Sequence, residues 1–169
     1  PELIYASISG VGAEGPYSRR RVYDPVIQAY AGFASAQTAN GEPGLIKMMI
    51  CDKVTSLTMA QAITAALYDR KNTGKGQHVE VSMLEASLYF NWPDRMLDQS
   101  FVDKPDSAGG DLTALYQAVP TQDGHITFMT LQLDEFHGLA RAVGKSEWAE
   151  DPRFQELMSM YAHYSEIYQ

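Results

Sequence analysis

The sequence predicts an α/β fold in two parts that a linker joins. Residues 1–97 alternate short β-branched runs with longer helical patterns, which is typical of strand–helix units. Residues 98–112, DQSFVDKPDSAGGDL, are polar and contain Gly and Pro, as linkers do. Residues 113–169 change to a hairpin pattern followed by a helix, which indicates a small and incomplete α+β domain.

The composition is that of an ordinary globular chain, with 45% hydrophobic and 20% charged residues. The net charge of −8 argues against a nucleic acid partner, because phosphate binding needs a basic surface. No apolar run in the given sequence is long enough for a membrane span, and we expect no signal peptide at its start. The single cysteine, Cys51, allows no intramolecular disulfide and favours a cytoplasmic protein. Because a strand pattern begins almost at Pro1 and a helix pattern stops abruptly at the other end, we expect a fragment of a longer chain.

The first elements are a strand, a loop and a helix. LIYASIS, residues 3–9, is β-branched and apolar and predicts a buried strand. GVGAEGPYSRRR, residues 10–21, is a glycine-rich loop that runs into three arginines. Asp24 and Pro25 predict a helix start, because Asp is a good N-cap and Pro suits the first helical position. Apolar residues at helical spacing continue that helix: Val26, Tyr30 and Phe33.

A long helix, a strand and a second helix follow. The long helix is predicted from about Val54 to Lys71, with Gly74 as its stop signal. Its inner face is expected at Met59, Ile63, Ala66 and Leu67. HVEVS, residues 78–82, predicts a strand. Ser82 and Glu85 then predict a capping box for a helix through Tyr89, which Pro93 breaks or kinks.

The last part begins with a hairpin. LYQAV and HITFMT flank TQDG, which predicts a turn at Asp123 and Gly124. A helix is predicted from about Asp134 to Val143, ended by Gly144. Its inward residues are expected to be Phe136, Leu139, Ala140 and Val143.

Several motifs have both a functional and a structural interpretation. GVGAEG, residues 10–15, matches G-x-G-x-x-G, but Pro16 and polar residues follow where a nucleotide-binding helix should begin. A glycine-rich turn is therefore favoured. The run Arg19 to Arg21 has the chemistry of an anion site, although a solvated loop is the simpler interpretation. The four histidines lack metal-ligand spacing, so no metal is expected.

Cys51 and Asp52 are the candidates for covalent chemistry. The thiol has no histidine close in sequence, so a buried structural cysteine is favoured over a nucleophile. Local sequence favours Asp52 as a cap for the helix that follows it. The same place suits a nucleophile, because a helix N-terminus stabilises an ionised carboxylate and the ionised form is the one that attacks.

Four stretches together carry a resemblance to a known family. They are LIYASISGVGAEGPY, RVYDPVIQAYAGF, the lone Asp52 before a helix, and NTGKGQHVEVSMLEAS. These resemble the family III CoA-transferases (CaiB/BaiF type), which include formyl-CoA transferase, carnitine CoA-transferase and α-methylacyl-CoA racemase. The resemblance is strongest from Leu3 to Ser87, and the later DGHITF and DPRF resemble the family's small domain.

The resemblance implies a fold that the residue patterns do not give. Members are much longer than this chain, with a Rossmann-like large domain built from both ends of the chain, two linkers and a small domain. Two such subunits interlock as a homodimer. This chain would hold the middle of the large domain, one linker and part of the small domain. Because much of the CoA-binding surface belongs to the missing part, we expect the fragment alone to be inactive.

The resemblance also implies an activity, acyl-CoA:carboxylate CoA-transfer, with Asp52 as the nucleophile. The carboxylate would attack an acyl-CoA thioester to form an anhydride, and the CoA thiolate would then form an aspartyl-CoA thioester. An acceptor acid would take the CoA by the reverse steps. By the same comparison Arg21 helps to hold CoA, Tyr23 lines the acyl pocket and Asp24 lies near it. Coenzyme A enters as a substrate, and no tightly bound cofactor is expected.

Two alternatives stay open. In the family's racemases a histidine at the position of Tyr23 exchanges the α-proton, and Tyr is a poor replacement for that base. A transferase is therefore favoured over a racemase or epimerase. A catalytically inactive CoA-binding module is the other alternative. Formyl or oxalyl substrates are not assumed, because the chain has only Gly109 and Gly110 where formyl-CoA transferase has a longer glycine run.

Overall fold

The computed structural model describes residues 2–95, 100, 102 and 116–168. The chain divides into two compact units, Pro1–Phe101 and Val102–Gln169, and each is described by itself. Most of the segment expected as a linker, including Gly109 and Gly110, lies outside the described residues.

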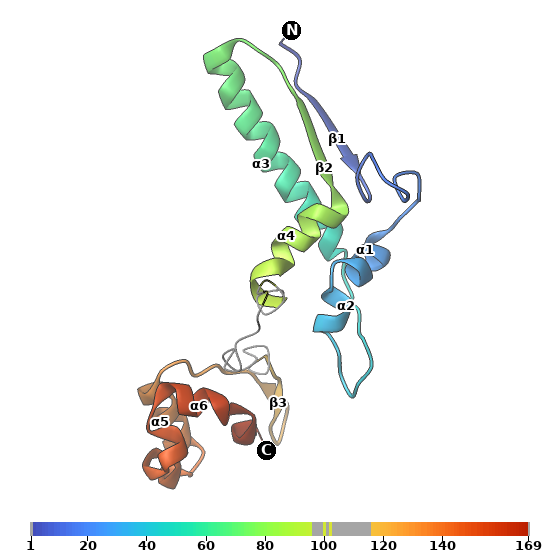
Figure 1. Ribbon diagram of the computed structural model, residues 1–169. Helices are drawn as coiled ribbons and strands as arrows, with labels where there is room; N and C mark the ends of the chain where they lie inside the picture. The colour runs from blue at the N-terminus through green and yellow to red at the C-terminus, as the bar shows by residue number, and fades with distance from the viewer. Residues whose placement is uncertain (1, 96–99, 101, 103–115, 169) are drawn as a thin grey trace. The chain divides into compact units, whose positions relative to one another are not determined.

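The first unit is built on two parallel strands with helices beside them (Figure 1). Strand β1, Tyr5–Ser9, pairs with β2, His78–Ser82, in a register that runs from Tyr5↔His78 to Ser9↔Ser82. The long helix α3, Ile50–Thr73, lies along both strands and leads into β2. Both predicted strands are present. The first begins two residues later than expected and is not buried as predicted, because Tyr5 and Ile8 are exposed.

Two glycines make the turn between α3 and β2. Gly74 ends the helix with φ 71°, a left-handed conformation that favours glycine, and its N–H donates to the Arg70 carbonyl at 2.8 Å. Gly76 lies against the start of the neighbouring strand, where an added Cβ would stand 1.9 Å from the Leu3 carbonyl oxygen. The sequence Gly-Lys-Gly therefore stops a helix and then admits a close backbone approach.

Helix α1, Asp24–Tyr30, begins one residue away from the prediction. Tyr23 is its N-cap, Asp24 is the first helical residue, and no side chain caps the helix. The helix also ends earlier than expected, because Gly32 adopts φ 85° and starts the separate short helix α2, Phe33–Ala36. The carboxylate of Asp24 therefore does not cap its own helix.

The buried face of α1 differs from the predicted one. Val26 and Tyr30 are exposed, whereas Ile27 and Ala31 are 0% and 1% exposed. Apolar residues four apart occur on both faces, so periodicity predicted the helix and not its inner side. Two further buried residues complete this core: Phe33 and Cys51.

Helix α3 starts four residues before the prediction, at Ile50. Met59 and Ala66 are buried as expected, but Leu67 is exposed. Helix α4, Met83–Arg95, follows β2 directly and contains Pro93 within its last turn.

The predicted capping interaction at the start of α4 is confirmed in part. Ser82 Oγ accepts the Glu85 N–H at 3.1 Å. In a full capping box, the Glu85 side chain would accept the backbone N–H of Ser82. Here Glu85 Oε2 accepts instead from the Ser82 hydroxyl at 2.8 Å.

The second unit begins with the predicted hairpin. Strands β3, Val119–Pro120, and β4, His125–Ile126, are antiparallel, and the Thr121 N–H donates to the Gly124 carbonyl at 2.9 Å. The predicted helix is α5, Leu133–Ala142, with Phe136 and Ala140 fully buried, whereas Val143 lies past its end and is exposed.

Short helices complete this unit, and their side chains close its core. They are the 3-10 helices η3 (Ser146–Glu150), η4 (Pro152–Phe154) and η5 (Tyr164–Tyr168), and helix α6 (Leu157–Ala162). Phe136 packs with Phe154, Met160 and Tyr164. The Thr130 N–H donates to the Tyr164 hydroxyl at 2.9 Å inside this core.

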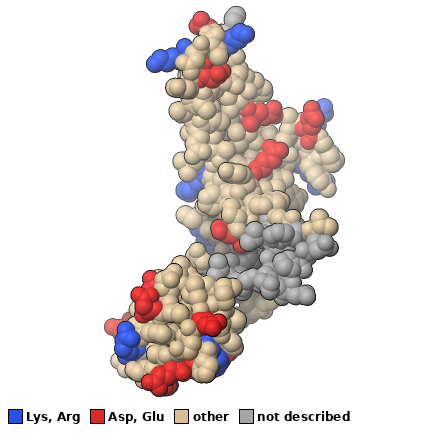
Figure 2. Space-filling model, turned by 60° about the vertical axis from the view of Figure 1, so that its left-hand side comes forward, with Lys and Arg blue, Asp and Glu red and all other residues tan. Residues whose placement is uncertain are grey.

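Charged side chains of both signs share the face of the molecule that Figure 2 shows. On the face in Figure 2, basic side chains stand apart from one another among acidic and uncharged ones. Among the described residues, no helix combines the length and the apolar character that crossing a membrane requires.

Candidate active site

Asp52 lies in the first turn of α3, but it does not cap the helix. The N-cap is Met49, and no side chain bonds back to it. The Asp52 carboxylate has no hydrogen-bond partner within the part of the chain that the structure describes, while its carbonyl accepts from Ser56 Oγ at 2.8 Å. The capping interpretation from local sequence is therefore wrong. The helix N-terminus still favours a negative charge at this place.

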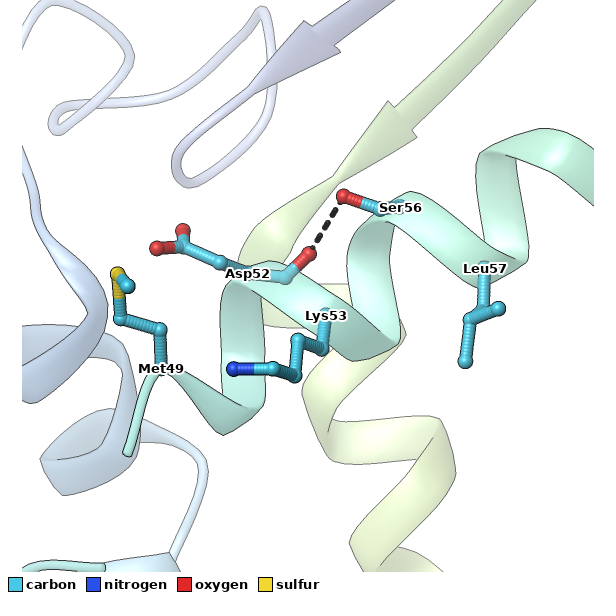
Figure 3. Close-up of a pocket in the computed structure, with 5 residues that line it drawn as sticks. All are labelled: Met49, Asp52, Lys53, Ser56 and Leu57. Carbon is cyan, nitrogen blue, oxygen red and sulfur yellow. Dashed lines mark hydrogen bonds between the residues drawn. The ribbon is translucent and has the colours of Figure 1, made fainter. Parts of the chain in front are cut away.

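Asp52 lines an open surface pocket of about 420 Å³, together with Met49, Lys53, Ser56 and Leu57. Figure 3 shows that the side chains of Asp52 and Lys53 both extend toward the side on which Met49 lies. Lys53 is exposed, and no ion pair to it occurs among the described residues. The lining of this pocket is mainly apolar, and one acidic and one basic residue contribute to it.

Asp24 holds the start of α3 from another helix. Its side chain is buried at 4% exposure, and its Oδ2 accepts the backbone N–H of Asp52 at 3.1 Å. Its Oδ1 accepts from Gln28 Nε2 at 2.6 Å. A buried carboxylate is costly unless donors satisfy it, and here amide groups and the start of α3 do so. The structure therefore brings the predicted residues Asp24 and Asp52 together through one backbone amide.

Gln28 is the residue that sequence reasoning missed. It is 1% exposed, and its Oε1 accepts the Ile46 N–H at 2.9 Å. The two hydrogens of its Nε2 are shared among three acceptors, which are Asp24 Oδ1 and the carbonyls of Ile46 at 3.0 Å and Met48 at 3.1 Å. The signal that could have found it is an amide placed four residues after an acid, between the buried residues Ile27 and Ala31.

Cys51 is a structural cysteine, as predicted. It is fully buried and unpaired. Burial raises the pKa of its thiol, the carboxylates of Asp24 and Asp52 raise it further, and the nearby hydroxyl of Ser87 opposes the shift. A thiol with a raised pKa is a poor nucleophile at neutral pH.

Arg21 and Tyr23 lie on the segment that leads into α1, and both are exposed. The carbonyl of Tyr23 accepts the N–H of Val26 at 2.9 Å, which starts the helix. Neither side chain is among the described residues that line the cavity at Asp52. The structure therefore places them beside Asp24 in the chain and leaves their binding roles as predictions.

The glycine-rich loop is a turn, as the sequence favoured. The Gly12 N–H donates to Ser9 Oγ at 3.1 Å, and no helix begins within the described residues 2–23. The guanidinium of Arg20 lies 4.5 Å from the centre of the Tyr17 ring, on the surface. No group of three or more His, Cys, Asp or Glu side chains that could hold a metal occurs among the described residues.

A profile described as CoA-transferase family III matches residues 1–169. The chain belongs to this family. It is 28% identical to the succinate–glutarate CoA-transferase of Agrobacterium fabrum, over 100% of this chain and 43% of that protein. It is 32% identical to the acetyl-CoA:oxalate CoA-transferase of Acetobacter aceti, over 92% of this chain and 41% of that protein. The resemblance that the motifs predicted is thereby confirmed.

Two solved structures share the mixed α/β fold of this chain. A CaiB/BaiF family protein from Brucella suis has a TM-score of 0.74 and 30% identity, over 99% of this chain and 45% of its own. A protein from Mycobacterium tuberculosis has a TM-score of 0.80 and 28% identity, over 98% of this chain and 44% of its own. This chain spans less than half the length of these family III relatives.

Proposed function

We propose that the full-length protein is an acyl-CoA:carboxylate CoA-transferase with Asp52 as its covalent nucleophile. The single observation that carries the proposal is the place of this carboxylate in a family III chain. It stands in the first turn of α3, its residue lines an open surface pocket of about 420 Å³, and it has no hydrogen-bond partner among the described residues. A carboxylate is ionised at neutral pH and needs no neighbouring base to attack.

The reaction divides one difficult exchange into steps with covalent intermediates. An oxygen of Asp52 attacks the thioester carbonyl carbon of the donor, the C–S bond breaks, and CoA leaves as a thiolate. The thiolate attacks the Asp52 carbonyl of the resulting anhydride, and the donor acid leaves as a carboxylate. The acceptor carboxylate then displaces CoA from the aspartyl thioester. The thiolate finally attacks the acceptor's carbonyl carbon, which restores the Asp52 carboxylate.

Lys53 gives the cavity a charge that suits this chemistry. Each half of the reaction brings a second carboxylate, as product or acceptor, toward the Asp52 group. An ammonium on the same cavity wall lowers the electrostatic cost of that approach. We assign Lys53 to the carboxylate end of the acids, and Arg21 and Tyr23 to CoA and the acyl group as the family resemblance implies.

The proposal extends to the whole protein. In the whole protein, residues 1–97 would form the middle of a Rossmann-like large domain. Residues 113–169 would form part of a small α+β domain, and residues 98–112 would link the two. The protein is proposed to be an interlocked, cytoplasmic homodimer. Its CoA is a substrate and not a resident cofactor.

The test uses the full-length protein with a panel of acyl-CoAs and free acids. After borohydride or hydroxylamine trapping, the mass of the peptide that contains Asp52 is measured. We expect an adduct in the wild type that appears only with acyl-CoA. Asp52→Asn should lose turnover by about a thousandfold or more, because it removes the nucleophile with little change of shape.

The matched control is Asp69→Asn, which neutralises an exposed acid at the other end of α3. It should retain wild-type turnover. Full turnover by Asp52→Asn would refute the proposal. Exchange of the α-proton without any acceptor acid, and without an adduct, would instead assign the protein to the racemase branch of the family.

A further inference from the structure

We propose that Gln28 is a positioning residue for the transfer reaction. Its side-chain amide holds the Asp24 carboxylate, and through it the first turn of α3, in the arrangement that presents Asp52 to the substrate. This inference rests on the proposed role of Asp52 as the nucleophile. Gln28 itself does not line the cavity at Asp52, so it acts through its neighbours.

The amide of Gln28 joins two segments that are far apart in the chain. On α1 it donates to Asp24 Oδ1 at 2.6 Å. On the segment before α3 it accepts from the Ile46 N–H at 2.9 Å and donates to the Met48 carbonyl at 3.1 Å. These partners require a side chain that both donates and accepts hydrogen bonds. A carboxamide has two N–H donors and a carbonyl acceptor, and so it meets this requirement.

That segment runs directly into the helix that carries Asp52. The Met48 N–H donates to the Ile46 carbonyl at 2.8 Å, and the Ile50 N–H donates to the Met48 carbonyl at 2.9 Å. Gln28 therefore fixes the start of α3 twice, through this segment and through Asp24, whose Oδ2 accepts the Asp52 N–H at 3.1 Å. A displacement of about 1 Å at a reacting group can cost about a hundredfold in rate.

The variant that isolates this role is Gln28→Glu, which keeps the shape and replaces a donor by a carboxylate. When both carboxylates are ionised at pH 8, the new one repels that of Asp24. This repulsion raises the pKa of one of the two, so that it takes up a proton at a higher pH than a free carboxylate would. A protonated Glu can again donate to Asp24 Oδ1. The other titratable or charged groups around the site are Cys51 and Asp52 on α3 and Lys47 in the preceding segment; α4 adds the uncharged hydroxyl of Ser87.

We expect kcat of Gln28→Glu to fall at least about tenfold at pH 8 and to recover in part at pH 5.5. KM for the acyl-CoA should change by less than about threefold, because the residue does not contact substrate. Gln28→Met, which has no donor at any pH, should show the loss without the recovery. The matched control is Gln61→Glu on the exposed side of α3, with the wild-type pH profile.

The measurements are steady-state kinetics and the rate of adduct formation on Asp52 in the full-length protein, with melting curves at both pH values. Wild-type kcat for Gln28→Glu at pH 8 would overturn the inference. So would an equal loss at both pH values, or a variant unfolded at both, since a purely structural role explains either. If the wild type forms no adduct on Asp52, the proposed function fails instead, whatever the Gln28 variants do.

Discussion

Replacement of Gly76 by alanine tests the close backbone contact between Gly76 and Leu3, just before the starts of β2 and β1. The added Cβ would stand 1.9 Å from the Leu3 carbonyl oxygen and 2.5 Å from the Leu3 carbonyl carbon, whereas Cβ contacts below 3.0 Å essentially do not occur. The two backbones must therefore separate by about 1 Å, since neither atom is the end of a flexible side chain.

The energetic cost follows from what that separation breaks. Strain from overpacking costs about 1–3 kcal/mol. The Tyr5 N–H to Gln77 carbonyl bond, 3.0 Å long, lies beside the contact, and its loss costs about 1 kcal/mol more. Arg70 donates to the Glu2 carbonyl at 3.1 Å on the exposed side and adds little. We expect Gly76→Ala to destabilise the protein by about 2–4 kcal/mol.

The assay is urea unfolding of the full-length protein, compared with Gly124→Ala as a matched control. Gly124 lies in the hairpin turn, where an added Cβ meets nothing within 4 Å. The control should stay within about 0.5 kcal/mol of the wild type. If Gly76→Ala is as stable as the control, the close approach does not exist in the protein and the account of the Gly-Lys-Gly turn is wrong.

Three further predictions concern single groups. Lys53→Gln should raise KM for the acceptor acid about tenfold, read from initial rates, while Lys71→Gln at the far end of α3 should not. The hydrogen bonds with Arg153 lower the pKa of Asp151 to about 2. The pair therefore stabilises the fold fully above about pH 4. This stabilisation is lost as the pH falls toward 2, where Asp151 takes up a proton. Arg153→Met should therefore lower the melting temperature at pH 6 and not at pH 2. Cys51 should resist iodoacetamide at pH 8 in the native protein and react once it is unfolded, as mass spectrometry would record; equal rates in both states would contradict its burial.

The elements that the sequence predicted well are those whose signals are local. Strand β2 has the predicted bounds, because its alternating residues lie between the Gly74–Gly76 turn and Ser82. The hairpin turn at Asp123 and helix α5 also follow from residues within a few positions of one another. Each of these depends on turn or cap chemistry that a short window contains.

The predicted start of α3 was wrong because the contact that sets it is not local. The group that satisfies the Asp52 amide is Asp24, which lies 28 residues earlier in the chain. A local window contains only Asp52 itself, and so it assigned the cap to the wrong acid. The prediction of the buried face of α1 was wrong for the same reason. That face is set by packing against Phe33 and Cys51 and by the buried amide of Gln28. Non-local contacts of this kind leave no periodic signal.

The same non-local cap explains how a carboxylate can stand at a helix start and remain available for chemistry. If Asp52 bonded back to its own helix, an attack would first have to break a hydrogen bond to a charged group. Such a bond contributes about 1.5–3 kcal/mol, which corresponds to roughly a tenfold to hundredfold loss of rate. In this site Asp24 accepts the Asp52 amide at 3.1 Å, and Gln28 holds Asp24 at 2.6 Å. One buried acid therefore stabilises the start of the helix, and the carboxylate of the second is left without a hydrogen-bond partner among the described residues, as the proposed transfer requires.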